Sequence, residues 1–350
     1  MTAIPSTDPT TGSHGAVANG PASDVMRAVL QDRYGSAEVL RVGSAQRPSI
    51  TDSQVLIAVE AAGIDRGTWH LLTGTPYLVR AMGFGLTRPK QPIPGLDVAG
   101  RVVAVGSGVT RFTPGDEVFG IASGSFAEYA AAEEHKLAVK PPAIAWEEAA
   151  VAAVSGITAL QALETAGASD GQQVLVLGAS GGVGSYAVQI ATALGAEVTG
   201  VASGGKAEMV RSLGAAHVLD YAVDDFADGS AAYDVIIDTG GNSSLRRLRR
   251  ALTPRGTLVI VGGETGGRWT AGIGRQLRAA LLSPFVPQRL RSIISKEHFA
   301  PMEALAAMLE RGEVVPAIDR VVGLDGVADA IDDLADGRVK GKVAVRVAAG

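Results

Sequence analysis

Residues 173–203 contain the motif that most restricts the fold of this chain. Val174 to Leu177 form an apolar run typical of a buried strand, and a glycine-rich loop follows. Apolar side chains then recur at helical spacing from Val183 to Leu194, and a second apolar run leads to Ser203. The order strand, glycine loop, helix, strand predicts a dinucleotide-binding unit.

The loop fits the pattern GxGxxG with Ala179 in the first glycine position. Small residues allow a pyrophosphate to approach the backbone, where N–H groups at a helix N-terminus stabilise its charge. A tight turn without a ligand is the alternative, and the strand before the loop and the helix after it favour the cofactor site. The residues expected to contact the cofactor are Ser180, Gly181, Gly182, Val183 and Gly184.

Further β runs at 217–219, 234–237 and 257–261 alternate with helical segments. This alternation predicts a parallel sheet covered on both faces, with the ligand at the carboxyl ends of its strands. The residues expected at that edge are Gly240, Gly241, Asn242, Val261, Gly262 and Gly263.

The end of the second strand indicates which nicotinamide cofactor is bound. NAD-binding units usually carry an acidic residue about 20 positions beyond the glycine motif, and here Ser203 stands 19 residues after Gly184. Lys206 and Arg211 follow, and they could pair with a 2′-phosphate. We therefore expect NADPH in preference to NADH, although the two basic residues also fit a solvated helix face.

Composition limits the classes of protein that remain. A chain of 350 residues exceeds one ordinary core, and a net charge of −5 does not suggest nucleic-acid binding. No uninterrupted apolar segment is long enough to span a bilayer. Residues 1–24 have neither a basic start nor an apolar centre, so they predict a disordered tail and not a signal peptide. Cytoplasmic residence is the resulting expectation.

The chain has no cysteine, which excludes disulfides, cysteine nucleophiles and thiolate zinc sites. Its five histidines are scattered without the spacing of a metal site. We therefore expect no catalytic metal.

The part before the glycine motif predicts a different fold. From Met26 to Ala138, short β runs are separated by turn dipeptides, which is typical of a small, mostly antiparallel barrel. Strand-like segments at 321–324 and 342–347 follow a helix at 302–310 and could complete that barrel. The fold class is therefore α/β: a barrel domain at 25–150, a doubly wound Rossmann domain at 151–300, and a return to the barrel domain at 301–350.

This order of segments resembles the medium-chain dehydrogenase/reductases, and specifically their zinc-free quinone oxidoreductase-like branch, from Met26 to Val347. The motifs that carry the resemblance are ITALQAL at 157–163, VLVLGASGGVG at 174–184, GKVAVRV at 341–347 and, most recognisably, PIPGLDVAGRVVAVGSGVTRFTPGDEVFG at 92–120. Zinc-dependent relatives have Gly-His-Glu where this chain has Gly95, Leu96 and Asp97, so Leu96 occupies the position of a metal-ligand histidine. The resemblance implies a GroES-like barrel, a homodimer and further cofactor contacts.

By motif position, Thr158 matches the residue that lies against the nicotinamide in this family. Ser203, Lys206 and Tyr221 match the contacts to the NADPH phosphate. Tyr221 equally fits a half-buried aromatic residue at a strand end.

On the substrate side, the segment 61–80 matches the family region that borders the nicotinamide. Asp65 and Thr68 stand where the family commonly has Asn and Asp, and these departures weaken any transfer of roles. Trp69, His70 and Tyr77 could line the pocket or donate a hydrogen bond. They also fit ordinary roles: barrel packing for Trp69, a surface or capping position for His70, and a loop aromatic for Tyr77.

These observations predict an NADPH-dependent reductase of quinones or α,β-unsaturated carbonyls. Without a metal, a conjugated acceptor is favoured because the charge that hydride addition creates is delocalised, and one or two hydrogen-bond donors can stabilise it. The candidate donors are Tyr77, His70 and Thr68. Two alternatives are a zinc-free carbonyl reductase or alcohol dehydrogenase, and a protein that binds or senses NADPH without turnover.

The segment 265–296 carries six basic residues and no acidic one. Ile273, Leu277, Ala280 and Leu281 fall at helical spacing, with Arg275 and Arg278 roughly opposite, so we expect an amphipathic helix. It could pack on the Rossmann domain as a solvated helix, form a mobile wall over the substrate mouth together with Phe285, or contact an anionic membrane surface.

Overall fold

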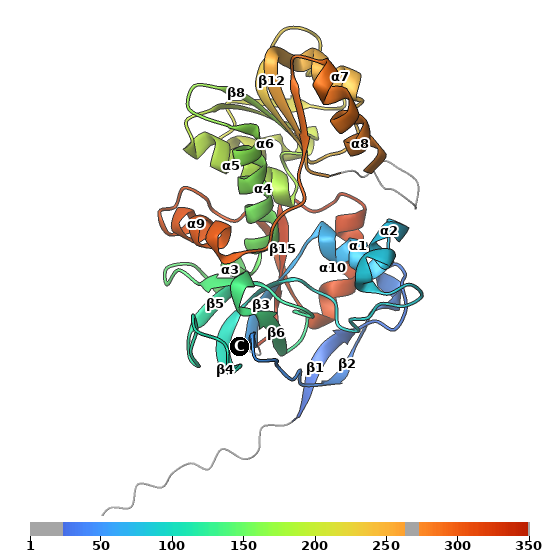
Figure 1. The fold of residues 1–350 in the computed structure, drawn as a ribbon, viewed down its shortest axis with the longest axis vertical. Coiled ribbons are helices and arrows are strands. Elements are labelled where there is room, and N and C mark those ends of the chain that lie inside the picture. The colour runs from blue at the N-terminus through green and yellow to red at the C-terminus, as the bar shows by residue number, and fades with distance from the viewer. Residues whose placement is uncertain (1–23, 263–272, 349–350) are drawn as a thin grey trace, which may run out of the picture.

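A computed structural model of the protein describes residues 24–262 and 273–348. Two main sheets lie at opposite ends of an elongated molecule (Figure 1). Gly263 and residues 1–23, which include most of the predicted tail, lie outside the described residues, as do 264–272 and 349–350.

The first sheet has six parallel strands in the order β10-β9-β8-β11-β12-β13. The expected doubly wound parallel sheet is therefore confirmed. Its strands are β8 (Gln173–Leu177), β9 (Glu197–Ala202), β10 (His217–Asp220), β11 (Tyr233–Asp238), β12 (Leu252–Ile260) and β13 (Arg289–Ser292).

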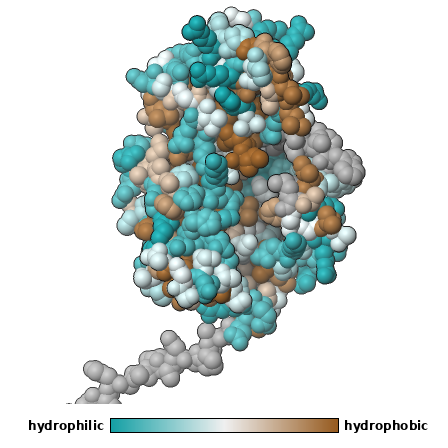
Figure 2. Space-filling model, viewed as in Figure 1, coloured by the Kyte–Doolittle hydropathy of each residue, from teal (hydrophilic) through white to brown (hydrophobic). Residues whose placement is uncertain are grey.

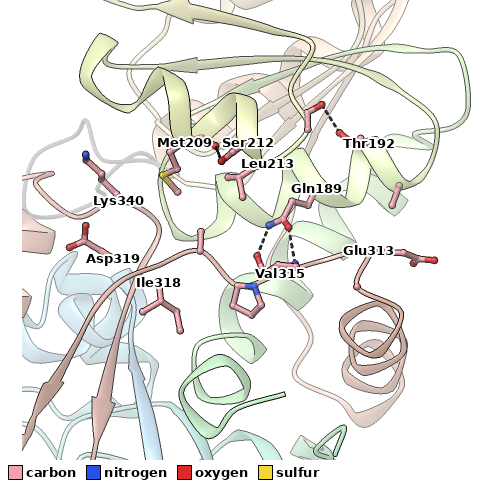
Figure 3. A pocket seen from close by; sticks show the side chains of 15 residues that line it. Gln189, Thr192, Met209, Ser212, Leu213, Glu313, Val315, Ile318, Asp319 and Lys340 are labelled. Carbon is pink, nitrogen blue, oxygen red and sulfur yellow. Dashed lines mark hydrogen bonds between the residues drawn. The ribbon is translucent and has the colours of Figure 1, made fainter. Parts of the chain in front are cut away.

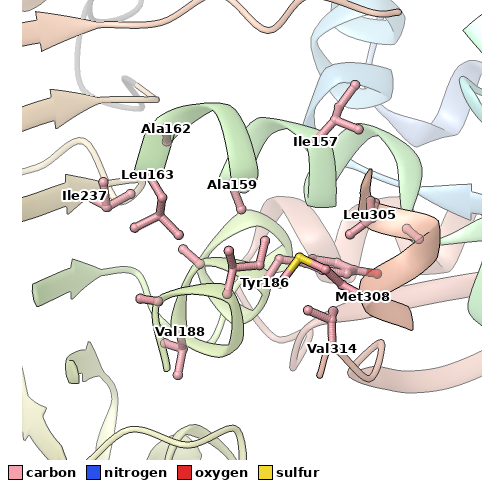
Figure 4. Packing of buried hydrophobic residues seen from close by; sticks show 14 of the residues in the cluster. Ile157, Ala159, Ala162, Leu163, Tyr186, Val188, Ile237, Leu305, Met308 and Val314 are labelled. Carbon is pink, nitrogen blue, oxygen red and sulfur yellow. The ribbon is translucent and has the colours of Figure 1, made fainter. Parts of the chain in front are cut away.

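The main core lies beside this sheet, where α4 (Ala153–Ala166) packs on α5 (Gly182–Ala193) and on α9 (Phe299–Glu310). Small residues such as Ala159 and Ala162 on α4 allow the close approach that Figure 4 shows. Tyr186 of α5 is fully buried there, and its hydroxyl donates to the carbonyl of Val151 at 3.0 Å. The one polar atom of this large ring is thus hydrogen-bonded, as burial requires.

The second sheet has seven strands, and all of its pairs are antiparallel except β14 with β15. β15, near the C-terminus, pairs with β3 and with β14, so strands from the two ends of the chain lie in one sheet. Its strands are β3 (Gln54–Ile64), β4 (Asp97–Val105), β5 (Glu117–Ile121), β6 (Tyr129–Glu133), β7 (Leu137–Val139), β14 (Ile318–Gly323) and β15 (Lys342–Arg346).

A separate hairpin of β1 (Val25–Leu30) and β2 (Arg41–Gln46), which the sequence did not predict, lies beside the second sheet (Figure 1). No helix in the described part of the chain is long and apolar enough to cross a membrane. The remaining helices are α1 (Arg66–Thr73), α2 (Tyr77–Val79), α3 (Trp146–Ala150), α6 (Ala207–Ser212), α7 (Leu245–Ala251), α8 (Ile273–Leu282) and α10 (Val327–Ala335).

Candidate active site

The glycine loop lies between the end of β8 and the first turn of α5. Gly181 caps α5 without a side-chain hydrogen bond, so the N–H groups of the first turn are left to a ligand or to solvent. A Cβ on Gly184 would collide with the carbonyl oxygen of Gly178, and Gly178 itself has a φ of 78°. Both positions therefore require glycine, and the loop has the form of an anion-binding helix N-terminus.

The loop after β11 lies beside the glycine loop, as expected for neighbouring parallel strands. Thr239 donates its hydroxyl to the carbonyl of Leu177 at 2.7 Å. A Cβ built on Gly181 would meet no atom closer than 3.4 Å, and one on Gly240 none closer than 3.8 Å. These are ordinary van der Waals distances, and both glycines are half-buried at the carboxyl edge of the sheet, where the cofactor is predicted to bind.

A buried ion pair supports this edge. Asp238 at the end of β11 and Arg275 of α8 lie 2.7 Å apart, with 1% and 12% of their side chains exposed. Asp238 also accepts from the Gly241 N–H at 2.9 Å, and Arg275 donates to the carbonyls of Ser243 and Gly262. Burial raises the pKa of the Asp238 carboxyl, and Arg275 opposes that rise. The pair therefore fixes both loops that are predicted to touch the cofactor.

This geometry also fixes the orientation of α8. The helix is present, but Leu277 and Leu281 are 60% and 73% exposed, and Arg275 faces the sheet together with the buried Ala279. The buried Asp238 carboxylate requires a counter-charge, which outweighs the apolar periodicity. Hydrophobic residues accordingly lie on the surface along the upper right edge in Figure 2, where Figure 1 places α8. The part of the basic segment at 265–272 lies outside the described residues.

The predicted phosphate-binding residues lie near the end of β9. The Lys206 ammonium donates to the carbonyls of Gly337 at 2.8 Å and Val339 at 2.7 Å, and burial lowers its pKa. Tyr221 is 68% exposed, and Ser203 begins a short helical turn. The half-buried Lys206 side chain is thus already hydrogen-bonded, and it links the Rossmann domain to the segment after α10.

Sequence reasoning missed a carboxylate beside this turn. A Cβ on Gly204 would lie 2.5 Å from Oδ2 of Asp220, and Oδ1 of Asp220 accepts from the Ala222 N–H at 3.0 Å. Asp220 ends the next strand, β10, so a search limited to the end of β9 overlooks it. A carboxylate here would oppose a 2′-phosphate or accept from a ribose hydroxyl.

A second buried ion pair lies within the seven-stranded sheet, where that sheet meets α4. Asp97 of β4 and Lys342 of β15 lie 2.9 Å apart, and Asp97 accepts from the Val154 N–H at 2.7 Å. Burial raises the pKa of Asp97 to about 6, Lys342 lowers it, and Asp65 raises it. Because Lys342 also approaches the glycine loop at Gly182, this cluster lies next to the predicted pyrophosphate site.

The structure brings two of the four predicted catalytic residues together. The Asp65 carboxylate accepts from the Thr68 N–H at 2.8 Å and from its hydroxyl at 3.2 Å, and both side chains are buried. This is an N-cap of α1, which gives both residues a structural role. Their catalytic roles stay predictions.

His70 and Tyr77 point to other contacts. The His70 ring nitrogen Nδ1 lies 2.7 Å from the carbonyl oxygen of Thr75, and the Tyr77 ring packs under the Arg80 guanidinium at 4.6 Å. Trp69 packs at the edge of a core cluster of the second domain, in line with the packing role considered for it. Thr158, predicted to face the nicotinamide, donates its hydroxyl to the Val154 carbonyl at 2.6 Å within α4.

Two pockets among the described residues are each lined by none of the predicted catalytic or cofactor residues. The larger, about 950 Å³, lies between α5, α6 and the segment 312–319, and none of the predicted cofactor residues lines it (Figure 3). In that view, the Gln189 amide pairs with the backbone of Val315 in both directions. The smaller pocket, of 240 Å³, includes Gly95 and Leu96, the positions that match the zinc-ligand motif of relatives.

The described residues contain no group of three or more His, Cys, Asp or Glu side chains that could hold a metal ion. Leu96 instead packs against the main core cluster.

Comparison with known proteins gives the same assignment for both domains. Residues 51–142 match the alcohol dehydrogenase GroES-like domain, and residues 213–345 match the family described as zinc-binding dehydrogenase. The chain is 33% identical to tomato (Solanum lycopersicum) 2-methylene-furan-3-one reductase, over 91% of this chain and 79% of that protein. It is 32% identical to the chloroplastic NADPH-dependent alkenal/one oxidoreductase of Arabidopsis thaliana, with the same coverage.

A solved structure of the quinone oxidoreductase from Coxiella burnetii superposes with a TM-score of 0.80 at 26% identity, covering 93% of this chain and all of that one. The chain belongs to the medium-chain dehydrogenase/reductase superfamily, in its quinone oxidoreductase-like branch. Sequence reasoning did not predict that Arg275, Asp220 and Lys342 lie at the candidate site. Asp220 and Lys342 are charged residues at the ends of strands, which is the signal that could have found them, whereas Arg275 is one of several arginines on or near α8 and its sequence gives no such signal.

Proposed function

We propose that this medium-chain reductase uses NADPH to reduce quinones or α,β-unsaturated carbonyl compounds without zinc. The observation that carries the proposal is the glycine loop at the start of α5, whose first-turn N–H groups have no side-chain cap and which lies beside the loop after β11. The names of the relatives, which include an enone reductase and a quinone oxidoreductase, support the acceptor class.

The residues of this chain fit the cofactor at the edge of the Rossmann sheet. Ser180 and Gly181 to Gly184 would hold the pyrophosphate through backbone N–H groups, and Gly240 to Asn242 with Val261 and Gly262 would border the nicotinamide half. Ser203, Lys206 and Tyr221 would face the 2′-phosphate, with Thr158 against the nicotinamide. When bound, NADPH supplies the hydride.

The protein itself would supply binding, orientation and a dry site. Holding the acceptor at the domain boundary gives proximity, which is worth several orders of magnitude in rate. Because a conjugated acceptor delocalises the developing negative charge, a hydroxyl or backbone N–H suffices as hydrogen-bond donor. Thr68, His70 and Tyr77 are the proposed side-chain donors near this boundary, and water is the proposed proton source.

Zinc independence rests on residues of the chain. It has no cysteine, and Leu96 stands at the position of a ligand histidine. We expect activity to survive prolonged chelation, with no stoichiometric zinc by elemental analysis. Loss of turnover with a chelator, restored by zinc, would overturn this part of the proposal.

The deciding experiment is an NADPH-oxidation screen with quinones, alkenals, 2-cyclohexen-1-one and saturated ketones. Turnover of the conjugated acceptors well above that of the ketones is expected. Comparable rates with ketones would instead assign a carbonyl reductase, and tight NADPH binding without oxidation of any acceptor would assign a binding or sensing protein.

We also propose that the reductase is a homodimer. β13 forms one edge of the six-stranded sheet, and an edge strand can pair with a second copy. Light scattering after gel filtration tests this, and a monomeric mass at micromolar concentration contradicts it.

A further inference from the structure

The 240 Å³ pocket of the GroES-like domain has a lining of mixed polarity. Its polar side chains are those of Gln31, Lys90, Gln91 and Ser123. The apolar side chains are those of Leu71, Phe84, Ile93 and Leu96. A pocket lined by both polar and apolar side chains suits a small molecule that carries one polar substituent on an apolar body.

Gln31 is the unusual member of this lining. Only 5% of the residue is exposed, and its Oε1 has no hydrogen-bond partner among the described residues. Its Nε2 lies 3.5 Å from the carbonyl oxygen of Gln91, at the outer limit for a hydrogen bond. Buried amide oxygens in native proteins are almost always paired, so this one calls for a donor.

The position of Gln31 is fixed by its neighbours. Its backbone N–H donates to the carbonyl of Pro92 at 2.8 Å. The Tyr34 hydroxyl lies 3.0 Å from the carbonyl oxygen of Phe84 and 2.7 Å from that of Gly85. This contact ties Phe84, another lining residue, to the segment that follows β1. The pocket is therefore largely preformed.

Leu96, one of the lining residues, connects the pocket with the proposed cofactor site. Leu96 is followed directly by Asp97, whose carboxylate contacts Lys342 and the start of α4. A Cβ on Gly182 in the glycine loop would lie 3.1 Å from Cδ of Lys342. One continuous set of contacts thus links the pocket wall to the glycine loop.

We propose that this pocket binds the acceptor and that Gln31 selects compact acceptors bearing a hydroxyl group, whose O–H donates to Oε1. The proposal rests on the proposed reductase function and names its substrate class. The volume lies just below the range of about 300–1,000 Å³ typical of ligand pockets, so a single-ring acceptor is expected. Its conjugated ring would lie against Leu96 and Phe84, with the hydroxyl toward Gln31.

The test compares 4-hydroxy-2-cyclohexen-1-one with 4-methyl-2-cyclohexen-1-one, which are similar in size. We expect the unaltered enzyme to favour the hydroxyl compound in kcat/KM, and Gln31→Met to reduce that ratio about tenfold, because an apolar side chain offers no acceptor. Gln31→Glu retains an acceptor oxygen and should keep the preference. Gln46→Met, an exposed glutamine on β2, is the matched control and should change nothing.

An unchanged ratio in Gln31→Met would overturn the proposal. If that variant does not fold, calorimetry provides a second test. It measures the binding of 4-hydroxycyclohexanone and of 4-methylcyclohexanone to the unaltered enzyme with NADP⁺, which requires neither the variant nor turnover. Tighter binding of the hydroxyl compound supports the proposal, and equal affinities refute it. Failure of the reductase function itself would show separately, as absence of turnover with unsubstituted 2-cyclohexen-1-one.

Discussion

The Lys342 ammonium lies 2.9 Å from the Asp97 carboxylate, and neither side chain exposes more than 1% of its surface. Asp97 also holds the backbone N–H of Val154 at the start of α4. A strand of the barrel, the returning strand and the first Rossmann helix therefore meet at one carboxylate.

Replacing one partner of this pair should be costly, because the other charge is then buried alone. We expect Lys342→Met, which leaves the Asp97 carboxylate buried without its counter-charge, to lower the free energy of unfolding at pH 7 by about 3–5 kcal/mol. The double variant Asp97→Leu with Lys342→Met should lose much less. Urea unfolding measures both, and Arg311→Gln, which breaks the exposed pair with Glu313, should cost less than about 1 kcal/mol. A single variant as stable as the unaltered protein contradicts this account.

The pKa of Asp97 sets a sign for the pH dependence. Burial raises the pKa to about 6 from the ordinary 3.8. Between these values the folded protein binds more protons at this site than the unfolded chain, so its contribution to stability increases as pH falls from 6 to 4. In Asp97→Asn this contribution is absent, so the free energy of unfolding should decline more steeply as the pH falls from 6 to 4. Unfolding free energies measured at pH 4, 5, 6 and 7 check the slope, and parallel profiles would refute it.

Cofactor choice depends on the charges around Ser203. We expect NADPH to bind at least about tenfold tighter than NADH, and Ser203→Asp to narrow or reverse that ratio, because a carboxylate opposes the phosphate. Asp220→Asn should widen the ratio, since it removes the carboxylate beside Gly204. Fluorescence titration gives the dissociation constants, with Asp228→Asn as the control. Equal affinities of the unaltered protein for the two cofactors would be decisive against the assignment.

Arg275 and Arg278 lie on the same helix but differ in surroundings. Arg275→Met should leave Asp238 buried without its counter-charge and release the carbonyls of Ser243 and Gly262. We expect weaker NADPH binding, by about tenfold, together with lower stability. Arg278→Met changes an exposed residue and should do neither. Equal NADPH affinities in the two variants would show that Arg275 does not support the cofactor loops.

The features that local sequence determines were predictable. The glycine loop, α5 and the parallel strands follow from spacing within some thirty residues, and the structure confirms them. Domain boundaries, and the roles assigned to individual site residues, stay predictions.

Features that depend on distant partners were not predictable. Asp97 and Lys342 are 245 positions apart, and neither spacing nor periodicity relates them. Apolar periodicity predicts the helix α8 but does not show that Arg275 faces the sheet, because the buried carboxylate that it pairs with lies on β11. Gln31 follows β1, a strand that the sequence did not predict. The lack of a partner for its Oε1 depends on the residues of the 83–96 segment that line the same pocket, and these are distant in sequence.

The pairing of β15 with β3 has a consequence for synthesis on the ribosome. β3 emerges early and β6 covers part of one edge, but the rest of that edge, at 61–64, cannot be covered until residues 342–346 have been translated. The strands of the parallel sheet, from 173 to 292, emerge as one uninterrupted stretch and can assemble before that moment. Folding should therefore proceed from the middle of the chain outward, and the N-terminal barrel should depend longest on chaperones that shield open strand edges.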